Sequence, residues 1–544
     1  MNRHLFLSSF FCILLFNVSA QTQKKNSVAD KPKLPLMGWA SWNQFGARID
    51  ENLIQSQADA MVSSGLAAAG YQYLNIDDGF FKGRYADGSF RTDSVKFPHG
   101  MKHLADYIHS KKLKAGFYSE AGENTCGSYY SGQPGGVGGG LYGHDQQDVN
   151  LFFKTWGYDF LKVDYCGGLK QKLDEKTRYT EIRKAIDNTG CDVNYNVCRW
   201  QFPGTWVTKV ADSWRMSNDI NFVPGSKPKW KSILGIINLN KYLAPYASAG
   251  HYNDMDMLEV GRGMTANEDK SHFSMWCILS SPLVLGFDMT KMSEETKTIV
   301  TNAEVIAVNQ DAAGIQGHLV WEKDSLQVWA KNLKDRQGKE FAVVLFNQGK
   351  IPSEMSVRWK DLNIAGNAKV RDLWAKKDLG TVDSVFSVTV PGHDVSMIKV
   401  TAAKTRLQDV FEAEYAWINN LNLTENSVIV ANQGKPVADA ACSGKAKVSW
   451  LGKGADNYLE FRDVFAKSKG SYTLTLYYVS GENRNLTLSV NGVDKIITGL
   501  NSGDWSKVKS TSVPVTLKKG YNVIRLSNAS EMMPDIDKIE FNLN

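Results

Sequence analysis

A lysine, an aspartate and a cysteine alternate within one short stretch of the sequence, residues 158–168 (YDFLKVDYCGG). Alternate residues of a strand point to the same face, so Lys162, Asp164 and Cys166 would lie on one side of it. A lysine beside an aspartate favours the ionised carboxylate, which is the form that a nucleophilic aspartate requires. The same pair could instead form a structural ion pair at a strand end, and this stretch alone leaves both interpretations open.

A second carboxylate, Asp219, ends the stretch WRMSND at residues 214–219. Its neighbours Trp214 and Met216 are less polar, and such surroundings raise the pKa of a carboxyl group. Glycoside hydrolysis uses one carboxylate that attacks the sugar and a second, protonated one that donates to the leaving oxygen. Asp164 and Asp219 would suit these two roles.

A sugar site also needs an aromatic face and rigid acceptors for hydroxyl groups. Trp42 could pack against the C–H groups of a sugar, and the adjacent carboxylates Asp77 and Asp78 could accept strong, directional hydrogen bonds. Taken singly, such aspartates are more typical of turns and helix caps. Their arrangement along the chain is what favours a site.

The segments that would position these residues alternate in type between residue 34 and about residue 310. Strands are expected at 37–42, 73–77, 115–119, 160–164, 193–198, 214–217, 246–249 and 283–287. Helices are expected at 51–64, 101–111, 146–155, 175–188, 232–243 and 272–279. This pattern predicts an α/β fold of the TIM-barrel type, (β/α)8, for residues 34–314, with a doubly wound open sheet as the alternative. In a barrel, the polar residues that follow the strands converge at one face.

The pattern changes beyond Asp311 to short alternating strands separated by turn residues. Residues 315–401 predict an antiparallel β-sandwich. The stretch TAAKT at 401–405 indicates a linker, taken as residues 402–406. Residues 407–544 predict a second β-sandwich, of the jelly-roll kind. The chain is therefore expected to be multidomain.

The first twenty residues have the features of a cleaved secretory signal, with Arg3 near the start, an apolar run at 5–18 and Val18-Ser19-Ala20 at the end. Residues 21–33 are polar and predict a flexible tail. The apolar run is shorter than a spanning helix requires, and no later run is long enough. We therefore expect an exported protein, periplasmic or extracellular, without a membrane span.

The composition is that of a globular protein, with 43% hydrophobic and 22% charged residues. The net charge of +6 is small for 544 residues and the basic residues form no long block, which argues against a nucleic-acid partner. The cysteines show no C-x2-C spacing, so structural zinc is not expected. The glycine-rich segment 132–143 lacks the lysine of a phosphate-binding loop and is expected to be a mobile loop over the barrel mouth.

Six segments of the barrel resemble glycoside hydrolase family 27, the α-galactosidases, in sequence and in order. They are LPLMGWASWNQF (34–45), YLNIDDGF (73–80), FLKVDYC (160–166), WRMSNDI (214–220), HYNDMDML (251–258) and VIAVNQDAAGIQG (305–317). The resemblance covers about residues 34–317. It implies a retaining exo-glycosidase that releases terminal α-linked galactose from oligo- or polysaccharides, without a metal or organic cofactor in the barrel.

The resemblance also assigns roles to single residues. Asp164 would be the nucleophile and Asp219 the acid/base, while Trp42 would stack on galactose. Asp77 and Asp78 would accept hydrogen bonds from the axial 4-hydroxyl and the 6-hydroxyl. The rest of the pocket would be lined by Tyr118, Lys162, Cys198, Arg199, Trp200, Arg215, Asp256 and Met257. A family disulfide would join Cys126 to Cys166.

Two departures from the family pattern concern the end of the fifth strand. The family commonly has Cys-Glu-Trp there, whereas this chain has Cys198-Arg199-Trp200. An arginine donates and cannot accept, which changes how the sugar 2-hydroxyl would be recognised. The usual partner of the cysteine at 198 falls near Ala211, so that disulfide is missing, and Cys191 either pairs with Cys198 or both stay free.

The last domain resembles carbohydrate-binding modules of families 6 and 35. Glu412, Glu414 and Asp537 match a calcium-binding pattern that joins the first and last strands, and such carboxylates suit calcium. Trp505, in SGDWSK, is a candidate sugar platform or else an aromatic residue that anchors its loop.

Three alternatives to the α-galactosidase remain at this point. One is a related β-L-arabinopyranosidase, whose sugar lacks the C6 hydroxymethyl group that Asp77 and Asp78 could bind. Another is a glycan-binding protein without catalysis, which the intact pair of aspartates disfavours. A metal-dependent hydrolase built on Asp254 and Asp256 is disfavoured because no histidine cluster accompanies them. The expected partner is an α-galactoside, and the oligomeric state is left open.

Overall fold

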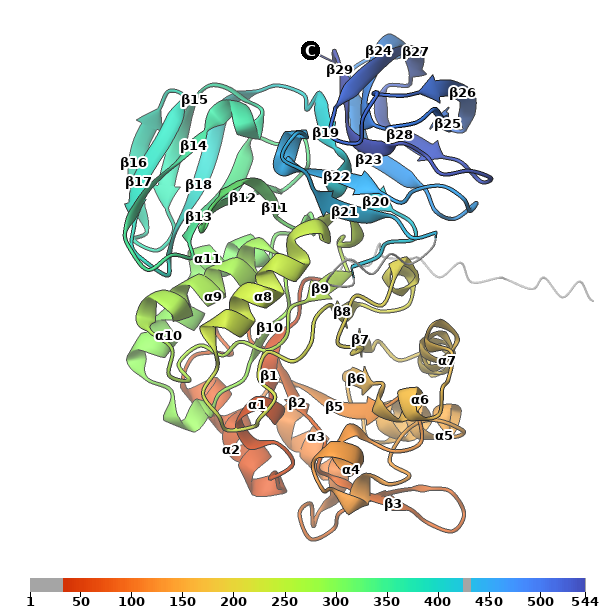
Figure 1. The fold of residues 1–544 in the computed structure, drawn as a ribbon. Coiled ribbons are helices and arrows are strands. Elements are labelled where there is room, and N and C mark those ends of the chain that lie inside the picture. The colour runs from red at the N-terminus through yellow and green to blue at the C-terminus, as the bar shows by residue number, and fades with distance from the viewer. Residues whose placement is uncertain (1–32, 424–431, 544) are drawn as a thin grey trace, which may run out of the picture. The chain divides into compact units, whose positions relative to one another are not determined.

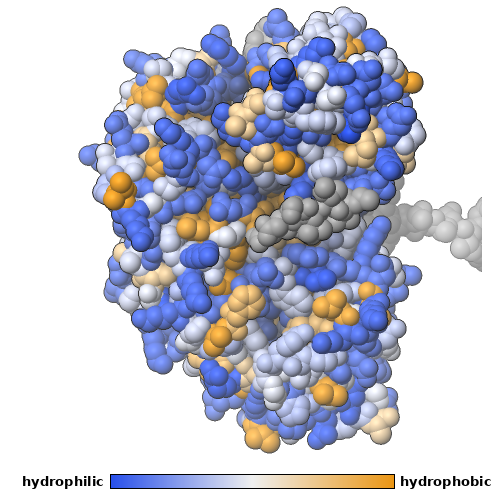
Figure 2. All heavy atoms as spheres, viewed as in Figure 1, coloured by the Kyte–Doolittle hydropathy of each residue, from blue (hydrophilic) through white to orange (hydrophobic). Residues whose placement is uncertain are grey.

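The computed structural model describes residues 33–423 and 432–543 (Figure 1). The expected signal peptide, and the expected tail up to Pro32, lie outside the described residues. None of the helices in the described part of the chain combines the length and the apolar character needed to cross a bilayer. Hydrophilic side chains cover most of the face seen in Figure 2.

Eight parallel strands form the first sheet, in the order β10-β1-β2-β5-β6-β7-β8-β9. They are β1 (Met37–Ala40), β2 (Tyr73–Ile76), β5 (Lys114–Glu120), β6 (Phe160–Asp164), β7 (Asn194–Val197), β8 (Ser213–Arg215), β9 (Tyr252–Asp254) and β10 (Leu283–Leu285). Backbone hydrogen bonds from Leu258 to Val284 and from Gly286 to Leu258 close the sheet after β9. The predicted barrel is confirmed.

Helices follow the strands around the barrel, and a short hairpin follows β2. The α-helices are α1 (Trp42–Phe45), α2 (Glu51–Ser63), α3 (Gly100–Ser110), α4 (Cys126–Tyr130), α5 (Asp145–Val149), α6 (Cys166–Lys170), α7 (Glu175–Asp187), α8 (Trp230–Leu239), α9 (Ala266–Ile278), α10 (Glu294–Val300) and α11 (Ala303–Asn309). A π-helical segment, η2 (Asn150–Thr155), continues α5, and the hairpin pairs β3 (Phe81–Arg84) with β4 (Phe90–Thr92). Short 3-10 turns are η1 (Pro134–Gly136), η3 (Thr205–Lys209), η4 (Asn240–Tyr242), η5 (Ala244–Tyr246) and η6 (Met289–Lys291).

Three of the longer helices, α2, α7 and α9, begin at side chains that satisfy free backbone N–H groups. Asp50 accepts from the N–H of Leu53 before α2, and Asp174 accepts from that of Thr177 before α7. Thr265 and Glu268 form a reciprocal capping box at the start of α9. These caps fix where each helix leaves the barrel rim.

The prediction of the seventh barrel strand at 246–249 is wrong. Residues 244–246 form the 3-10 turn η5, and the strand itself is β9 at Tyr252–Asp254. Pro245 lies at the start of that turn, and a proline has no N–H with which to pair in a sheet. The apolar residues before β9 therefore form the connection and not the strand.

An antiparallel β-sandwich follows the barrel, as predicted. One sheet has the order β11-β12-β13-β18-β15-β16 and the other pairs β14 with β17. The strands are β11 (His318–Lys323), β12 (Leu326–Leu333), β13 (Glu340–Asn347), β14 (Ser353–Arg358), β15 (Ile364–Asp372), β16 (Lys377–Val382), β17 (Val385–Val390) and β18 (Asp394–Thr405), with the 3-10 turn η7 (Trp359–Leu362) between β14 and β15.

The expected linker at 402–406 is corrected by the structure. Residues up to Thr405 extend β18, and Thr405 pairs with Ile364 of β15. The N–H of Arg406 then donates to the carbonyl of Asn363. A short polar stretch that looks like a linker is thus held in a strand because a partner strand is available.

The C-terminal domain is a second antiparallel sandwich with its own core. One sheet has the order β21-β22-β29-β24-β27, with β19 also paired to β29, and the other has the order β20-β23-β28-β25-β26. The strands are β19 (Val410–Glu412), β20 (Trp417–Ile418), β21 (Lys435–Ala438), β22 (Ala446–Ser449), β23 (Leu459–Ala466), β24 (Gly470–Val479), β25 (Arg484–Val490), β26 (Val493–Leu500), β27 (Lys509–Leu517), β28 (Gly520–Ser527) and β29 (Asp535–Phe541). Two 3-10 turns are η8 (Ala413–Tyr415) and η9 (Ser443–Lys445).

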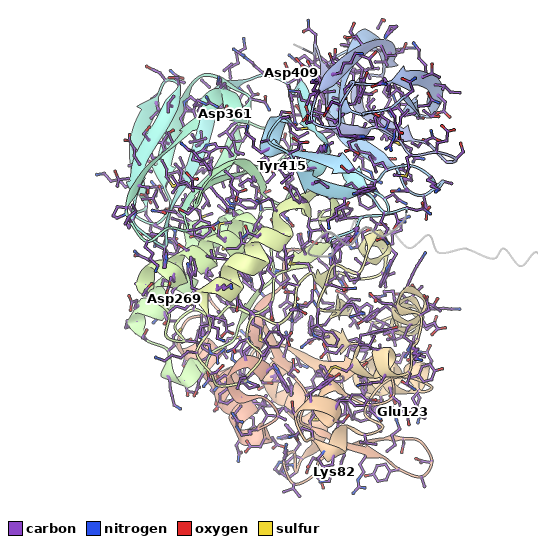
Figure 3. All side chains as sticks on the ribbon, viewed as in Figure 1. Lys82, Glu123, Asp269, Asp361, Asp409 and Tyr415 are labelled. Atoms are coloured by element: carbon purple, nitrogen blue, oxygen red, sulfur yellow. A yellow bond between two sulfur atoms is a disulfide. The ribbon has the colours of Figure 1, made fainter. Side chains whose placement is uncertain are left out.

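Aromatic residues join this C-terminal domain to the rest of the chain. Tyr415, labelled in Figure 3, packs against Tyr242 of the barrel and His318 of the first sandwich, with ring centroids 5.8 and 6.4 Å away. Trp417 packs on Tyr246 at 4.8 Å, and the Tyr246 hydroxyl donates to the carbonyl of Ile418. The C-terminal domain therefore contacts the segment just before β9.

Candidate active site

The predicted site residues lie where the parallel strands of the barrel end. Asp77 and Asp78 follow β2, Lys162 and Asp164 end β6, and Arg215 ends β8. Because all eight strands are parallel and closed, these ends share one face of the barrel. The fold thus gathers the predicted residues into one region.

Lys162 is the positive centre of this region, and Asp77 is its nearer partner. Its Nζ atom lies 2.9 Å from Oδ2 of Asp77 and 3.7 Å from Oδ1 of Asp164. The sequence suggested the pairing with Asp164 two residues away, whereas the stronger contact crosses from β6 to the loop after β2. Lys162 therefore holds two carboxylates from different strand ends.

Asp164 is almost fully buried, and its Oδ1 atom has no hydrogen-bond partner among the described residues. Burial raises the pKa of this carboxyl group to about 7, while the charge of Lys162 and a hydrogen bond from the Cys198 thiol lower it. The expectation that Lys162 alone would keep Asp164 ionised is therefore too simple, because desolvation is the larger effect. Nζ of Lys162, 3.7 Å from Oδ1, is the nearby positive charge.

Asp78 is held by one oxygen and free at the other. Its Oδ2 atom accepts from the N–H of Gly127 at 2.8 Å, and its buried Oδ1 atom has no partner among the described residues. A Cβ atom at position 127 would come within 2.4 Å of Oδ2, so a glycine is needed for this contact. Burial raises the pKa of Asp78 to about 6. The free oxygen suits a substrate hydroxyl.

The predicted disulfide between Cys126 and Cys166 is present, with Cα atoms 5.1 Å apart. It joins the start of α4 to the start of α6, next to the end of β6. The N–H of Cys126 donates to the hydroxyl of Tyr118, whose ring lies 5.5 Å from Nζ of Lys162. Tyr118 is thereby fixed between the disulfide and the lysine.

Glu120 is a buried residue of this region to which the sequence reasoning gave no role. It ends β5 and accepts from the N–H groups of Gly122, Cys166 and Gly168. Burial raises the pKa of its carboxyl group to about 8. In the sequence, its position at the end of an apolar strand was the only indication that it belongs to this region. It anchors the backbone that follows Asp164.

Asp219 lies in a polar setting, contrary to the sequence-based expectation. Its side chain is 33% exposed, and its Oδ1 atom accepts from Nη2 of Arg215 at 3.0 Å. Trp214 is fully buried and donates instead to Asn253, while Met216 is buried in the core. The apolar neighbours in sequence therefore do not surround the carboxylate.

Arg215 also joins Asp219 to the other side of the site. Its Nη2 atom lies 3.0 Å from Oδ2 of Asp256, and its Nη1 atom lies 3.8 Å from the sulfur of Cys198. Asp256 also accepts from the N–H of Ile220, and burial raises its pKa to about 6. Asp164, Cys198, Arg215 and Asp219 thus form a continuous chain of contacts.

Arg199 does not reach toward this pocket. Its Nε atom donates to Oε2 of Glu175 at 2.7 Å, and its guanidinium lies 5.3 Å from the ring of Tyr165. The substrate contact expected for Arg199 is replaced by an ion pair with the start of α7. Cys191 and Cys198 are not joined to each other, and both carry free thiols.

Six of the predicted residues line a cavity inside the barrel: Asp77, Tyr118, Lys162, Arg215, Asp256 and Met257. Four further polar residues line it and were not selected as substrate ligands from the sequence: Asn75, Asn196, Ser213 and Asp254. Asn196 donates to both Ser213 and Asp254 at 2.8 Å. Trp42 is half-buried at the start of α1, and Trp200 has a left-handed backbone, with φ of 62°, after β7.

The acidic residues predicted to bind calcium are brought together in the C-terminal domain. Ser443 donates from its hydroxyl to Glu412 at 2.7 Å and to Asp537 at 3.1 Å. Glu414 is only 1% exposed, and neither of its carboxyl oxygens has a hydrogen-bond partner among the described residues. Burial and the charges of Glu412 and Asp537 raise the pKa of Glu414 to about 9. Such a group fits a bound cation.

Trp505, the candidate platform, is 43% exposed. The guanidinium of Arg484 lies 4.6 Å from its ring centroid, and a Cβ atom at position 481 would come within 2.5 Å of the indole nitrogen. One part of the ring is therefore packed within the domain, while the exposed part is available to a ligand.

Two family models match the chain. A model described as alpha galactosidase A matches residues 34–311, and a model of the alpha galactosidase C-terminal β-sandwich domain matches residues 323–400. The first match covers the whole barrel and the second covers most of the sandwich that follows it. Together they span the cluster built around Lys162, Asp164 and Arg215.

Individual proteins give the same result. Alpha-galactosidase A of Cellvibrio japonicus is 37% identical over 71% of this chain and 96% of its own length. Alpha-galactosidase 2 of Arabidopsis thaliana is 41% identical over 68% of this chain and 90% of its own. The crystal structure of alpha-galactosidase I from Mortierella vinacea matches 69% of this chain and 98% of its own, with a TM-score of 0.62 and 35% identity. This chain therefore belongs to the alpha-galactosidase family, glycoside hydrolase family 27.

Proposed function

We propose that this protein hydrolyses terminal α-linked galactosides with retention of configuration, with Asp164 as nucleophile and Asp219 as acid/base. One observation carries the proposal. Asp164 and Asp219 end up at the same barrel face, linked through Cys198 and Arg215 and close enough for the charge of Asp219 to raise the pKa of Asp164. Release of galactose from an aryl α-galactoside, followed by NMR of the first anomer formed, tests both the activity and its stereochemistry.

The first step forms a covalent intermediate. A carboxylate oxygen of Asp164 attacks the anomeric carbon, and the bond from that carbon to the leaving oxygen breaks. Asp219 gives its proton to the leaving oxygen, so the aglycone departs as a neutral alcohol. Oδ1 of Asp164 accepts no hydrogen bond from the described residues and lies 3.7 Å from Nζ of Lys162, which supports its role as the attacking group.

The second step restores the enzyme. Asp219, now a carboxylate, takes a proton from water while the water oxygen attacks the anomeric carbon. The ester bond to Asp164 breaks and galactose leaves with its original configuration. The one-third exposure of Asp219 supports this role, because the incoming water must reach it from solvent.

Recognition of galactose would rest on the loop after β2 and on α1. We assign Asp77 to the 4-hydroxyl and Asp78 to the 6-hydroxyl, with Trp42 stacking on the sugar. The free oxygen of Asp78 supports a substrate that carries a group at C6, which favours a galactoside over a β-L-arabinopyranoside. Tyr118, Lys162, Arg215, Asp256 and Met257 complete the pocket.

The neighbourhood of the 2-hydroxyl is assigned to Cys198 and Trp200. Arg199 donates to Glu175 and does not reach the pocket. Its two neighbours, Cys198 and Trp200, would therefore form the pocket wall beside the 2-hydroxyl. The alternative of a glycan-binding protein without catalysis is disfavoured by the retained Asp164 and Asp219. A chromogenic assay with an α-galactoside separates the two.

We also propose a structural calcium ion in the C-terminal domain, held by Glu412, Glu414 and Asp537. The buried carboxyl group of Glu414 supports it, because neither oxygen has a partner among the described residues and both burial and the charges of Glu412 and Asp537 raise its pKa. Such an ion would supply cross-linking of the first strand to the last and takes no part in hydrolysis.

The C-terminal domain is proposed to be a carbohydrate-binding module of the family 6 and 35 kind, with Trp505 as its platform. Support comes from the two antiparallel sheets and from the partly exposed indole. A Trp505→Ala variant should keep its rate on an aryl galactoside and lose retention on insoluble galactomannan. Equal retention of the variant and the wild type would remove this assignment.

Export to the periplasm or the extracellular space is proposed from the signal-like residues 1–20. The Cys126–Cys166 disulfide supports an oxidising compartment. Mass spectrometry of the protein from its native host tests this proposal, since it would find the mature chain starting at Gln21. The expected partner is an α-galactoside oligosaccharide or polysaccharide.

A further inference from the structure

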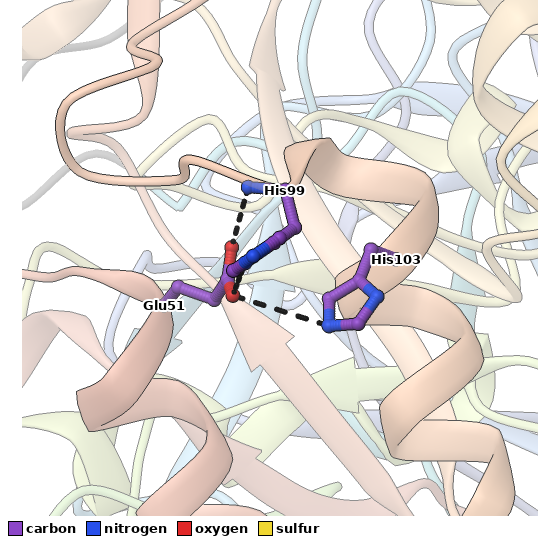
Figure 4. A group of neighbouring side chains, drawn as sticks. All are labelled: Glu51, His99 and His103. Carbon is purple, nitrogen blue, oxygen red and sulfur yellow. Dashed lines mark hydrogen bonds and ion pairs between the residues drawn. The ribbon is translucent and has the colours of Figure 1, made fainter.

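We propose that Glu51, His99 and His103 form a binding site for a divalent transition-metal ion of the zinc type (Figure 4). The site lies outside the substrate pocket, between the first turns of α2 and α3. It is separate from the carboxylate cluster of the C-terminal domain, which offers oxygen ligands.

The two imidazoles come from one helical turn. His99 directly precedes α3 with a helical backbone, and His103 lies four residues further along. Residues four apart in a helix face the same side, so both rings point toward α2, with centroids 5.0 Å apart. Glu51, the first residue of α2, faces them from the neighbouring helix.

The three ligand atoms converge on one point. Oε1 of Glu51 lies 2.7 Å from Nδ1 of His99 and 4.0 Å from Nε2 of His103. Ligand atoms on one tetrahedral zinc lie roughly 3.3 Å apart, given metal–ligand bonds of about 2.0 to 2.2 Å. The two distances lie on either side of this value, so small side-chain rotations would accommodate the ion.

The carboxylate is held in place and the imidazoles are open to solvent. Glu51 is 5% exposed, and its Oε2 atom accepts from the backbone N–H of His99 at 3.2 Å. The side chains of His99 and His103 are 66% and 50% exposed. The other close carboxylate, Asp106, is paired at both oxygens with Lys102. The remaining coordination positions would be filled by water.

The ligand types select the class of ion. Two imidazole nitrogens and one carboxylate oxygen suit zinc, copper or nickel, whereas calcium and magnesium prefer oxygen ligands alone. The bound ion would replace the hydrogen bond between Glu51 and His99. Through its three ligands it would connect α2, which carries Glu51, to His99 before α3 and to His103 within α3.

This link would brace the loop that carries Asp78. The N–H of Glu51 donates to the carbonyl of Lys96, and Nζ of Lys96 donates to the carbonyls of Ala47 and Gly79. Gly79 directly follows Asp78. A metal ion at the cluster would therefore stabilise this part of the rim without contacting substrate.

Zinc titration of the full-length protein, by calorimetry in a buffer with saturating calcium, tests the proposal. Calcium occupies any oxygen-only site, so the zinc isotherm reports imidazole ligands. The wild type should bind one zinc ion. The His103→Ala and Glu51→Gln variants should each bind zinc at least about tenfold more weakly. The melting temperature of the wild type should rise with zinc and fall back with chelator.

His109→Ala is the matched control. His109 lies on the same helix, with its Nε2 atom 2.9 Å from a carboxylate oxygen of Asp159, but among the described residues no group of three possible metal ligands includes it. This variant should bind zinc as the wild type does. His103→Ala keeps the hydrogen bond between Glu51 and His99, so its fold without metal should be unchanged. Superimposable zinc isotherms for the wild type and His103→Ala would overturn the proposal.

Discussion

Nη2 of Arg215 donates to Oδ1 of Asp219 over 3.0 Å, four residues along the same strand end. The guanidinium orients the carboxyl group at the rim of the barrel, where the Asp219 side chain is 33% exposed. Arg215 is buried and also forms an ion pair with Asp256, so its guanidinium is held in place. The position of the proposed acid/base is therefore set by an arginine and not by apolar packing.

Replacing Asp219 by alanine should separate the two catalytic steps. With an aryl galactoside whose leaving group needs no proton, Asp164 still forms the intermediate, but no base activates water. Turnover should fall about 10²- to 10⁴-fold and be restored by azide, which needs no base. The product should be the α-galactosyl azide, identified by NMR. Failure of azide to raise the rate, or formation of the β-azide, would contradict the assignment.

Replacing Asp164 by asparagine should remove the nucleophile while keeping nearly the same shape. We expect kcat to fall by at least about 10³-fold, which corresponds to ~4 kcal/mol of activation free energy. Circular dichroism should show an unchanged fold. Asp174→Asn, which alters only the cap of α7, is the control and should retain wild-type kcat. Substantial activity of Asp164→Asn would refute the mechanism.

The acidic side of the pH profile should report the ionisation of Asp164. Burial raises the pKa of this carboxyl group to about 7, and it attacks only when deprotonated, so kcat/KM should rise with pH through about 7. Lys162 lowers this pKa, so Lys162→Met should move the rise to higher pH. Lys162→Arg keeps the charge and should move it less. Coincident pH profiles for the wild type and Lys162→Met would contradict the assignment of the acidic limb to Asp164.

Asp78 should distinguish sugars by their C6 group. Its free Oδ1 atom is assigned to the 6-hydroxyl, and a hydrogen bond to a charged group contributes about 1.5 to 3 kcal/mol. Asp78→Ala should therefore lower kcat/KM on an aryl α-galactoside about 10- to 100-fold. On the matching β-L-arabinopyranoside, which lacks this hydroxyl, the loss should be much smaller. Equal losses on both sugars would show that Asp78 does not read C6.

Removal of calcium should affect the C-terminal domain and leave the barrel chemistry intact. Chelator should lower the melting temperature of the wild type and leave kcat on an aryl galactoside unchanged. Glu414→Gln keeps the volume of the side chain but loses one ligand charge, so added calcium should no longer raise its melting temperature. Asp439→Asn, whose carboxylate pairs with Lys447, is the control and should keep the calcium response. A chelator-insensitive wild type would argue against the ion.

The barrel could be predicted from the sequence because its strands and helices have strong, regular patterns. Seven of the eight strands fall where apolar extended segments were expected. The exception is the seventh barrel strand, β9, because Pro245 lies in a 3-10 turn formed by the apolar segment that was expected to be the strand. Local pattern also failed at residues 402–405, where pairing with β15 extends a strand through a stretch that looked like a linker.

The partners of the site residues could not be predicted, since they come from other strands. The closest partner of Lys162 is Asp77, 85 residues earlier, and not Asp164 two residues later. Arg199 turns to Glu175 of α7, and Asp219 meets Arg215 instead of the apolar neighbours in its own stretch. Sequence adjacency indicates which residues share a strand end, whereas the fold decides which side chains meet.

Strand β19 pairs with β29, so the first and last strands of the C-terminal domain are neighbours in one sheet. Because its two ends lie close together, such a domain can be inserted into another protein through short connectors. For the same reason it can be circularly permuted. The engineering of chimeric hydrolases that carry this domain would need only the few connecting residues around Arg406.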